Sequence, residues 1–572
     1  MDKCLCAKEV LETYKEITIT QVSGNIIMFQ LFNKEFALLC PLLSDLPAVI
    51  LLHNDNGFDF PHVLLKDYLL KEDSFLPEGE YRKVCLYEPE SMVFSIMSYD
   101  EKIIDVIDRL IKLLSLNQKE REREFQKEFM YYWNNLAGST FVKIYLSQDK
   151  NFSKMKCYCR KIGKDGYERR FIEQGLQLSD INGTNKKGEH IWQEHVENNV
   201  YYIPIIDNRE ILPPYRGCPW TIDNVKNIIC GKQIDHISND TYQIIKEEKV
   251  ATQNIILVFG MQIEKRFTCF AVEIKCKNRN NRTVMEKVCE DSLAIGLLKS
   301  ARKDFAFLNS LIGNDIGLIG KKVLLVGCGS LGSYIALELI KNGVSHLKIY
   351  DGDALEDENT FRWIFGSIGK GCNKAENLSW LLTWIHPEIH VEAVKRNIDD
   401  TILAKESKEC DMIIFSVGSS DSQMCFNRVL KLGNCNIPVF YSWIEAGGEF
   451  SHILLVDYVR QGCYQCLFTD EEGRLVNNRA NFNNEPVNDN RIIRNGCGGT
   501  RAAYGTAVLL RTTAALLDMI KKFLSGTVNG TALIDVTSQK TIYRKDMLPM
   551  ERCNCCGNSN KRSLCEDGTS ES

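Results

Sequence analysis

The sequence predicts an α/β protein whose largest part is a doubly wound, Rossmann-like domain. Residues 301–558 alternate apolar strand-like runs with helical stretches, which is typical of a parallel sheet with helices on both faces. The run KKVLLVG leads into GCGSLGS and then into a helix, the context in which a glycine loop binds phosphate. At 572 residues the chain is too long for one core, so further domains are expected.

The composition is that of an ordinary globular protein, with 44% hydrophobic residues, 25% charged residues and a net charge of −5. This charge gives no electrostatic basis for a nucleic-acid or membrane partner. The charged start MDKCLCAKEVLETYKE predicts no signal peptide, and no run reaches the roughly 18 apolar residues of a spanning helix. The 23 cysteines indicate a reducing cytoplasm, with most thiols buried as small hydrophobes and a few serving as metal ligands or nucleophiles.

Three further regions flank or precede this domain. Residues 1–120 carry the strand-like runs NIIMFQLF, FALLC and PAVILL, followed by the amphipathic helix DEKIIDVIDRLIKLLSL. Residues 121–300 open with the helical segment KEREREFQKEFMYYW and continue as a mixed α/β linker region to which we assign no chemistry. Residues 559–572 form a polar tail that we expect to be disordered.

Within residues 301–558, the strands KKVLLVG, HLKIYD and DMIIFSVG are separated by helical runs such as SYIALELIKNG. Gly327, Gly329 and Gly332 have the G-x-G-x-x-G spacing, which lets backbone approach phosphate at a helix N-terminus. Asp351 follows the next strand, where a carboxylate can accept ribose hydroxyls. On these residues alone, an NAD-dependent dehydrogenase fits equally well.

The segment after Asp351 favours a triphosphate over a nicotinamide. Asp353, Asn359, Arg362 and Lys374 fall within one short excursion. Two cations and an amide near a glycine loop suit ATP and its departing pyrophosphate, whereas a nicotinamide needs a flat apolar site.

This pattern resembles the ubiquitin-activating superfamily of the ThiF/MoeB type, whose bacterial members adenylate the C-terminal glycine of sulfur-carrier and ubiquitin-like proteins. The resemblance implies that Asp351 and Asp353 lie at the nucleotide, Asp351 holding ribose, and that Asn359, Arg362 and Lys374 hold the phosphates of magnesium ATP. It also implies a homodimer.

This chain departs from the family pattern in two places. Trp363 stands where the family has glutamine. The magnesium-binding aspartate is assigned to Asp421 with a short insertion, since an ungapped alignment puts Gly418 there. Arg302 occupies the place of a family arginine that reaches a nucleotide, sometimes across a dimer.

Two separated C-x-x-C pairs, Cys463 with Cys466 and Cys553 with Cys556, have the spacing of a tetrahedral structural zinc site. Cys555 is an alternative to either member of the second pair. Four thiolate ligands leave no open position for water, so we expect a closed site without catalysis by the metal. In the resembling superfamily this metal pins the chain end to the adenylation domain.

Cys497 lies between the two metal pairs in RNGCGGTRAAYG, where the superfamily places its catalytic cysteine. A nucleophilic thiol must ionise, and the flanking Arg494 and Arg501 together with a following helix favour the thiolate. The surrounding glycines would let the segment approach the adenylate and withdraw. The pattern therefore indicates thioester chemistry in addition to adenylation.

A second cysteine, Cys85 in EYRKVCLYEPE, follows the strand FPHVLL and precedes the amphipathic helix. This order resembles reduced bacterial ubiquitin-conjugating domains, so residues 1–120 are interpreted as such a domain. Together with residues 301–558, the order resembles the fused activating–conjugating proteins of bacterial CBASS anti-phage operons. The resemblance implies that the C-terminus of a cGAS-like nucleotidyltransferase passes from Cys497 to Cys85 and then to a target protein amine.

Three alternatives remain open at this point. A sulfur-carrier-type enzyme would stop at the adenylate and use the N-terminal region for docking. An NAD-dependent oxidoreductase would use the glycine loop for a redox dinucleotide. A non-enzymatic binding module would need neither Arg362 nor Lys374.

Overall fold

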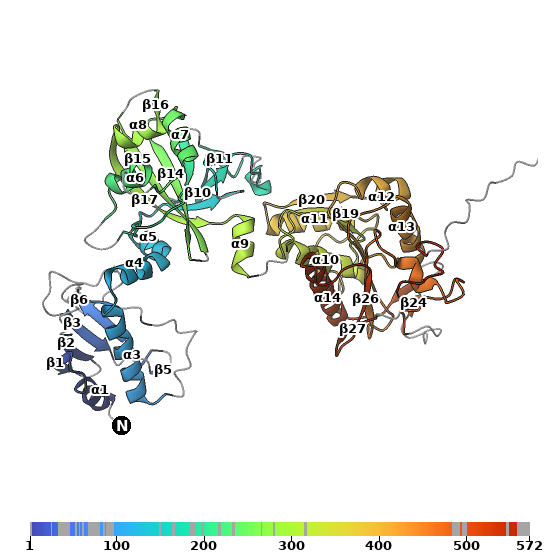
Figure 1. Ribbon diagram of the computed structural model, residues 1–572, viewed down its shortest axis with the longest axis horizontal. Helices are drawn as coiled ribbons and strands as arrows, with labels where there is room; N and C mark the ends of the chain where they lie inside the picture. Colours follow the sequence, from blue (N-terminus) through green and yellow to red (C-terminus); the bar gives the residue numbers. More distant parts are fainter. Residues whose placement is uncertain are drawn as a thin grey trace, which may run out of the picture. The chain divides into compact units, whose positions relative to one another are not determined.

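The computed structural model describes most of the chain in two compact units (Figure 1). The described residues are 3–23, 26–31, 46–51, 54–55, 58–59, 62–66, 81–83, 86, 97–147, 150–162, 166–182, 190–195, 199–214, 219–231, 235–264, 266–277, 281–313, 317–482, 492–494, 500–544 and 548–557. The first unit comprises residues 1–176 and 192–303, and the second comprises residues 177–191 and 304–572.

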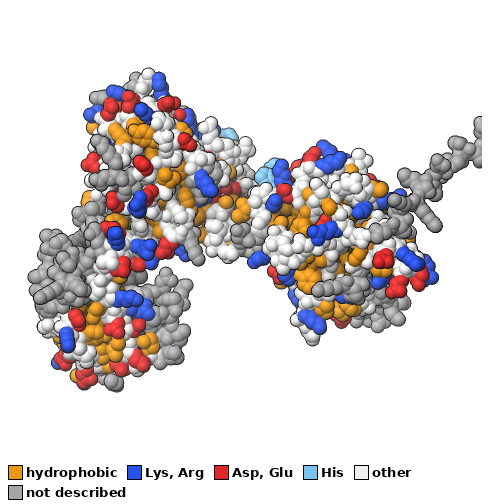
Figure 2. Space-filling model, viewed as in Figure 1, with side chains coloured by type: hydrophobic (Ala, Val, Ile, Leu, Met, Phe, Trp, Pro, Cys, Tyr) orange, Lys and Arg blue, Asp and Glu red, His pale blue; other side chains and the backbone are white. Residues whose placement is uncertain are grey.

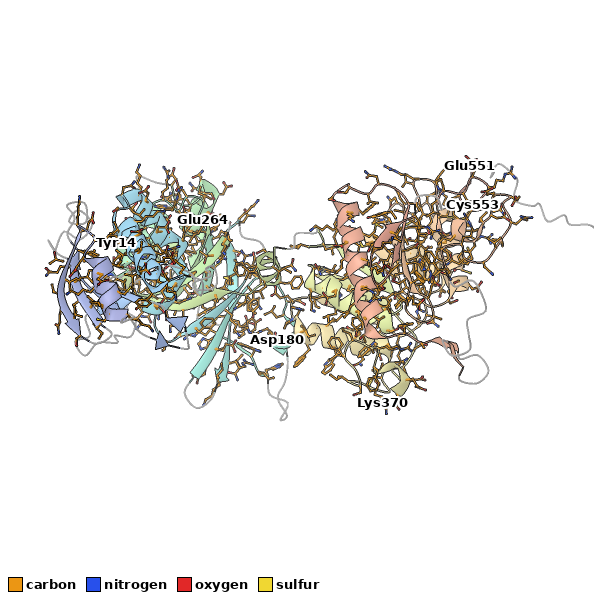
Figure 3. All side chains as sticks on the ribbon, turned by 90° about the horizontal axis from the view of Figure 1, so that it is seen from below. Tyr14, Asp180, Glu264, Lys370, Glu551 and Cys553 are labelled. Carbon is orange, nitrogen blue, oxygen red and sulfur yellow. The ribbon has the colours of Figure 1, made fainter. Side chains whose placement is uncertain are left out.

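The first unit begins with an antiparallel sheet and two helices. Its strand order is β1-β2-β3-β6-β7, so neighbours along the chain are neighbours in the sheet. Helices α1 and α3 cover it with apolar residues such as Leu11, Ile103 and Ile107. Tyr14, labelled in Figure 3, donates a hydrogen bond to the Asp108 carboxylate at 2.7 Å and ties the end of α1 to α3. The elements are α1 (Lys3–Leu11), β1 (Ile17–Ser23), β2 (Ile26–Leu31), β3 (Leu46–Leu51), β4 (Asn54–Asp55), β5 (Phe58–Asp59), β6 (His62–Lys66), β7 (Tyr81–Lys83) and α3 (Tyr99–Leu114).

The charged segment predicted as one helix forms two, α4 (Gln118–Lys127) and α5 (Phe129–Leu136). They meet at Glu128, whose backbone is not helical. The second helix buries Phe129 and Trp133, and the Trp133 indole donates to the Leu298 carbonyl at 2.9 Å. The break between the two helices allows the aromatic residues of α5 to pack on the sheet. The charged α4 needs no such contact.

The rest of the first unit is a sheet that closes on itself. Its order is β10-β8-β17-β15-β14-β12-β9-β11, and β9 also pairs with β10. One core lies within it, around Phe171 and Val258, and a second lies outside it, beneath the helices. The elements are β8 (Phe141–Tyr145), β9 (Ser153–Ile162), β10 (Gly166–Glu173), β11 (Gln193–Glu194), β12 (Asn199–Pro204), α6 (Ile222–Cys230), α7 (Asn239–Glu247), β13 (Lys249–Val250), β14 (Ile255–Ile263), β15 (Arg266–Cys276), β16 (Arg282–Thr283), α8 (Val284–Cys289) and β17 (Ser292–Arg302).

Arg302 belongs to this closed sheet. It is the last residue of β17, is 8% exposed, and lies over the Phe267 ring at 4.9 Å. Neither cavity described below includes it in its lining.

The second unit has a mixed eight-stranded sheet in the order β20-β19-β18-β21-β22-β23-β26-β27. Its elements are η3 (Ser179–Asn182), α9 (Phe305–Leu311), β18 (Lys322–Val326), α10 (Ser330–Lys341), β19 (His346–Tyr350), η4 (Asp357–Asn359), α11 (Lys374–Ile385), β20 (His390–Val394), α12 (Asp400–Glu406), β21 (Met412–Phe415), α13 (Ser420–Leu432), β22 (Val439–Ile444), β23 (Ser451–Val456), η5 (Tyr464–Phe468), β24 (Ile492–Arg494), β25 (Thr500–Ala502), α14 (Thr506–Leu524), β26 (Ala532–Val536) and β27 (Thr541–Tyr543).

Helices cover both faces of this sheet, as the strand–helix alternation predicted. Residues of α10, α11 and α14, such as Ile335, Leu378 and Leu516, share one core. Leu403 of α12 and Phe426 of α13 belong to the core of the other face. The predicted Rossmann-like, doubly wound architecture is therefore confirmed for this unit.

The prediction of a parallel sheet is confirmed for five of its eight strands and is wrong for the other three. Strands β20, β19, β18, β21 and β22 are parallel, whereas β23, β26 and β27 run antiparallel to their neighbours. Only residues 445–450 join β22 to β23, and only residues 537–540 join β26 to β27. Such short connections cannot make the crossover that a parallel pair requires.

The distribution of charged side chains on the surface agrees with the small net charge of the chain. Basic and acidic side chains are interspersed on the visible face of each unit (Figure 2). Within the parts of the chain that the structure describes, no helix combines the length and apolar character needed to cross a bilayer.

Candidate functional site

The candidate site lies where the order of the parallel strands changes direction. Strand β18 is flanked by β19 on one side and by β21 on the other, and the chain crosses the sheet between them. In sheets of this kind, ligands bind beyond the carboxyl ends of the strands at this point. The segments that leave these ends are the glycine loop after β18, Asp351 after β19, and Ser416–Gly418 after β21.

The glycine loop needs two of its glycines for close packing. Gly327 has a φ of +89°, and a Cβ there would lie 2.7 Å from the Ser416 carbonyl oxygen. A Cβ on Gly332 would lie 2.1 Å from the Gly327 carbonyl oxygen. Gly329, the N-cap of α10, faces open space instead. The loop is therefore pressed against β21 and α10, while its middle glycine is available to a ligand.

Gly332→Ala is expected to lower the free energy of unfolding of the second unit by about 1–3 kcal/mol, because the added methyl overpacks the loop. Gly329→Ala is the matched control for packing, because its added carbon meets no atom within 4 Å. Urea unfolding of both variants checks this. Equal destabilisation by the two substitutions would contradict the packing role assigned to Gly332.

Asp351 is held in place by the glycine loop itself. Its carboxylate accepts hydrogen bonds from the backbone N–H groups of Cys328 at 2.8 Å and Asp353 at 2.9 Å. Burial raises the pKa of the Cys328 thiol well above its ordinary value, with the Asp351 carboxylate adding to the shift, so Cys328 stays a neutral thiol. Each Asp351 carboxylate oxygen can accept a second hydrogen bond, for example from a ribose hydroxyl.

Trp363, one of the departures from the family pattern, braces the same loop. Its side chain is 3% exposed, and its indole N–H donates to the Cys328 carbonyl at 3.1 Å. The large ring also belongs to the core beneath α10. The tryptophan therefore supports the loop through packing and one hydrogen bond.

Two cations converge beside the loop. Lys374 begins α11, and its ammonium pairs with the Asp353 carboxylate at 3.0 Å. The Lys374 side chain is 10% exposed whereas that of Asp353 is 70% exposed. The Arg362 guanidinium lies over the Tyr504 ring at 5.0 Å, and the Tyr504 hydroxyl shares a 2.8 Å hydrogen bond with Ser330 of the glycine loop. The Asn359 amide oxygen accepts from the backbone N–H of Glu356 at 3.2 Å.

Two adjoining cavities open at this point. The first has about 370 Å³ and is lined by Asp351, Asp353, Asn397 and Ile398 among others. The second has about 570 Å³, and its lining includes Asn359, Arg362, Glu445 and the aromatic residues Trp443, Tyr464 and Tyr504. Gly329, Lys374, Ser416, Val417 and Gly418 line both. The first cavity has the size and donors for a nucleoside, and phosphates reaching the shared residues would lie at the mouth of the second.

Asp421, the predicted magnesium ligand, does not join these residues. It is exposed in the first turn of α13 and is absent from both cavity linings, although its neighbours Ser420 and Ser422 each contribute to one. Gly418, the position given by the ungapped alignment, lines both cavities but offers no side-chain oxygen. The carboxylates that line the nucleoside cavity are Asp351 and Asp353.

Sequence reasoning missed a buried polar chain under the second cavity. His452 of β23 is fully buried; its two ring nitrogens lie 2.7 Å from Glu445 and 2.7 Å from Asp535. Asp535 also accepts from Arg544 at 2.8 Å, and Glu445 accepts from the Phe482 backbone N–H at 2.9 Å. This network of hydrogen bonds holds the Glu445 carboxylate at the cavity. A histidine inside the apolar strand SHILLV was the available signal, because a buried histidine needs partners.

The stability of the second unit is expected to fall as pH rises above about 6.5 and through the raised pKa of His452. Burial alone would lower the pKa of His452, but its hydrogen bonds to Asp535 and Glu445 outweigh burial and raise that pKa above 6.5. A group whose pKa is raised by folding contributes its full stabilisation when the pH is below its unfolded-state pKa. That stabilisation is lost as the pH rises through the folded-state pKa. The difference in urea-unfolding free energy between the parent chain and His452→Gln should therefore shrink with increasing pH. A pH-independent difference would contradict this.

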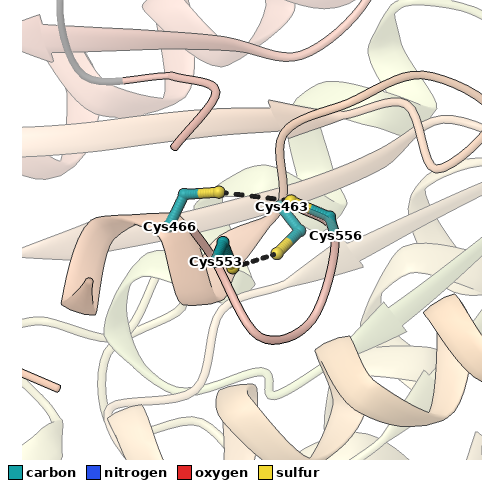
Figure 4. Close-up of side chains that lie close together, drawn as sticks. All are labelled: Cys463, Cys466, Cys553 and Cys556. Carbon is teal, nitrogen blue, oxygen red and sulfur yellow. Dashed lines mark hydrogen bonds between the residues drawn. The ribbon is translucent and has the colours of Figure 1, made fainter. Parts of the chain in front are cut away.

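Four cysteines form a metal-ligand cluster. The Sγ atoms of Cys463, Cys466, Cys553 and Cys556 all lie within 4.8 Å of one another, and all four residues are buried. Cys463 and Cys553 are 3.8 Å apart and Cys466 and Cys556 are 3.3 Å apart (Figure 4). Tetrahedral zinc with Zn–S bonds of about 2.3 Å requires S–S edges of about 3.8 Å, so these residues fit zinc.

Cys555 is not among the four grouped sulfurs, although its thiol also interacts with that of Cys463. Its sulfur accepts from the Asn427 amide at 3.4 Å. The Asn427 amide oxygen in turn accepts from the Tyr464 backbone N–H and from the Tyr458 hydroxyl, each at 3.0 Å. Within the described residues, the four cysteines are the one group of three or more potential ligands with this proximity.

The two predicted nucleophiles lie outside the described residues. Cys497 falls between β24 and β25, which pair as an antiparallel hairpin, and Cys85 falls two residues after β7. Their roles stay predictions, as do those of Arg494 and Arg501, of whose side chains nothing is described.

Comparison with known proteins supports the reading of the second unit. Residues 318–559 match the ThiF family. The chain is 22% identical over 518 residues to the "ATP-dependent ubiquitin transferase-like protein Cap2" of Escherichia coli strain TW11681, covering 83% of this chain and 82% of that protein. It is 25% identical over 237 residues to the protein of the same name from Pseudomonas aeruginosa, covering 40% and 41% of the two chains.

Solved structures give a third comparison. The chain resembles E. coli MccB crystallised with ATP, with 21% sequence identity, a TM-score of 0.34, and coverage of 43% of this chain and 69% of that one. The family match over residues 318–559 agrees with the resemblance that the glycine loop and the residues after Asp351 predicted, and this part of the chain is a ThiF family domain.

Proposed function

We propose that this enzyme uses ATP to adenylate the C-terminal carboxylate of a protein. A carboxylate oxygen attacks the α-phosphorus, the bond to the β-phosphate oxygen breaks, and pyrophosphate leaves. The observation that carries the proposal is the pair of cavities that meet at Gly329, Lys374 and Ser416–Gly418. One cavity suits a nucleoside, and the other, with three aromatic residues and two cations in its lining, suits an acyl tail with its reacting end at Lys374.

The nucleotide residues have distinct roles in this proposal. Asp351 accepts ribose hydroxyls, and the Asn359 amide donates to the phosphates. Arg362 and Lys374 neutralise the phosphates and the charge that develops on pyrophosphate. Gly327, Gly329 and Gly332 form the backbone cradle, and the N-terminus of α10 faces it. Magnesium, when bound with ATP, adds further charge neutralisation. Asp353, exposed beside Lys374 in the nucleoside cavity, is better located for it than Asp421.

The second stage of the proposal is thioester transfer. The Cys497 thiolate attacks the acyl carbonyl and AMP leaves; the Cys85 thiolate then displaces the Cys497 thiolate in a nearly balanced exchange. A target amine attacks the Cys85 thioester, forms an amide and releases the thiolate. The N-terminal arrangement supports a ubiquitin-conjugating-like domain: α1, an antiparallel sheet containing His62, the Cys85 position, and then α3.

The proposed carrier is the C-terminus of a cGAS-like nucleotidyltransferase or of a ubiquitin-like protein, in cytoplasmic anti-phage defence by a homodimer. Similarity to a ubiquitin transferase-like protein over 83% of the chain supports conjugation. The sulfur-carrier-type alternative uses the same first stage without Cys85. An NAD-dependent oxidoreductase is disfavoured because Arg362 and Lys374 line the cavity where a flat apolar nicotinamide site would be required.

Incubation of the full chain with magnesium ATP and a cGAS-like carrier, followed by non-reducing electrophoresis, tests the proposal. Two thiol-sensitive adducts are expected. Cys497→Ala should abolish both, while Cys85→Ala should retain the first and lose the second together with the conjugate. Pyrophosphate exchange that persists in Cys85→Ala, with no conjugate formed by the parent chain, would favour the sulfur-carrier alternative. Failure of the chain to exchange labelled pyrophosphate with ATP, in the presence of the carrier, would reject adenylation itself.

A further inference from the structure

A pair of cysteines outside the proposed site is arranged for oxidation. Cys230 ends α6 and Cys289 ends α8, and their sulfurs lie 3.0 Å apart although 59 residues separate them in sequence. This distance is only about 1 Å longer than the ~2.05 Å of an S–S bond. The Met285 thioether lies 3.3 Å from the Cys230 sulfur, so the surroundings are soft and apolar on one side.

The two thiols differ in pKa, and disulfide formation requires one of the two to ionise. The hydrogen bond between the two thiols lowers the pKa of Cys289 to about 7, with Lys226 contributing, despite opposing burial and the nearby Glu290. The same hydrogen bond, together with burial, raises the pKa of Cys230, so its thiol stays protonated. Both residues are half-buried, which admits a small oxidant. Near neutral pH one partner is therefore substantially a thiolate, the form that reacts with peroxide.

We propose that Cys230 and Cys289 form a reversible disulfide when the chain meets a peroxide. The Cys289 thiolate attacks one peroxide oxygen, the O–O bond breaks, and a sulfenic acid forms with release of hydroxide. The Cys230 sulfur, losing its proton, then attacks the sulfenic sulfur and expels hydroxide. In sum, two thiols and one hydrogen peroxide give one disulfide and two waters, and a dithiol reductant reverses the change.

The disulfide would join two helices on the outside of the closed sheet. Val225 and Ile228 of α6 and Val284 and Val288 of α8 belong to the same apolar core. The segment enclosed by the bond contains α7, β14 and β15. Oxidation therefore covalently closes a large part of the first unit, a part to which the proposed adenylation and transfer chemistry assigns no residue.

A second thiol pair provides an internal comparison. Cys157 and Cys159 lie on one strand, β9, with their sulfurs 4.0 Å apart, and hydrogen bonding from Cys157 lowers the pKa of Cys159 to about 6. Strand geometry holds Cα atoms two residues apart at about 6.6 Å, near the upper limit for a disulfide. The pair has the more acidic thiol but the poorer geometry. We therefore expect Cys159 to oxidise without cross-linking efficiently.

The test treats the full chain with equimolar hydrogen peroxide after chelator treatment, blocks free thiols with iodoacetamide, and digests with trypsin without reduction. The expected product joins tryptic peptides 227–232 and 288–299 at a mass two hydrogens below their sum. It should exceed the disulfide within peptide 157–160 by at least about 10-fold and disappear with dithiothreitol. In Cys230→Ser, Cys289 should instead be trapped as a dimedone adduct.

Two outcomes would overturn the proposal. Recovery of Cys230 and Cys289 as alkylated thiols, to the same extent as the buried Cys276, would show that the pair does not oxidise. A yield of the 230–289 cross-link no greater than that of randomly paired cysteines would show that proximity does not direct the reaction. Both readouts use the parent chain, so they do not depend on whether a serine variant folds.

Discussion

Lys374→Ala is expected to weaken ATP binding by about 10- to 100-fold and to lower carrier-dependent pyrophosphate exchange by about 100- to 1,000-fold. The Lys374 ammonium is the one cationic group that lines both cavities among the described residues, and only a tenth of its side chain is exposed. A partly buried cation acts more strongly on phosphate than one in water. Calorimetric titration with ATP and exchange of labelled pyrophosphate measure the two effects.

Lys370→Ala is the matched control for this prediction. Lys370, labelled in Figure 3, pairs with Asp357 at 2.7 Å on an exposed part of the same excursion and lines neither cavity. Its removal should leave the dissociation constant for ATP within about 2-fold of the parent value, because exposed ion pairs contribute little. If both lysine variants bound ATP like the parent, the phosphate role of Lys374 would be untenable.

Cys466→Ser is expected to reduce bound zinc to well below one equivalent per chain and to destabilise the second unit by more than about 4 kcal/mol. The cause is local: Cys466 and Cys463 lie at η5, whereas Cys553 and Cys556 come from the chain end, and the metal would join them. Loss of one thiolate leaves three buried sulfurs without a shared cation. Metal analysis of the purified chain and its thermal unfolding measure the effect, and prolonged chelation should reproduce it.

Cys555→Ser tests whether zinc binding depends on the four ligand cysteines or on any thiol in this region. The Cys555 sulfur accepts a hydrogen bond from Asn427, and a serine hydroxyl can accept the same hydrogen bond. Zinc content should therefore stay at one equivalent per chain. Zinc loss in Cys555→Ser as complete as in Cys466→Ser would place the wrong cysteine in the site.

Local spacing predicted much of the nucleotide-binding half of the site. The three glycines, Asp351 and Lys374 are close in sequence, and a strand–turn–helix unit determines their relative positions almost by itself. The structure brings these residues to one edge of the sheet as the spacing indicated. The metal cysteines were equally accessible to sequence reasoning, since each pair is local and only the choice between Cys555 and Cys556 required the fold.

Residues whose function depends on distant partners were not predictable in this way. His452, Glu445 and Asp535 meet only because β23 pairs with β26 across 83 residues. Asp421 was assigned from a gapped pattern, and its place on α13 turns it away from both linings. The closed sheet of the first unit was also not foreseen, because closure depends on the pairing of β9 with β10 and not on any local period.

The four-cysteine cluster has a mechanical consequence for the chain that it encloses. Each contact joins residues 90 positions apart, so everything from Cys466 to Cys553, including Cys497, forms a loop fastened at both ends. Proteolytic cleavage within that loop would leave two fragments that co-elute in size-exclusion chromatography. Removal of a metal bound by the four cysteines would then leave only the strands and helices of the second unit to hold the fragments together.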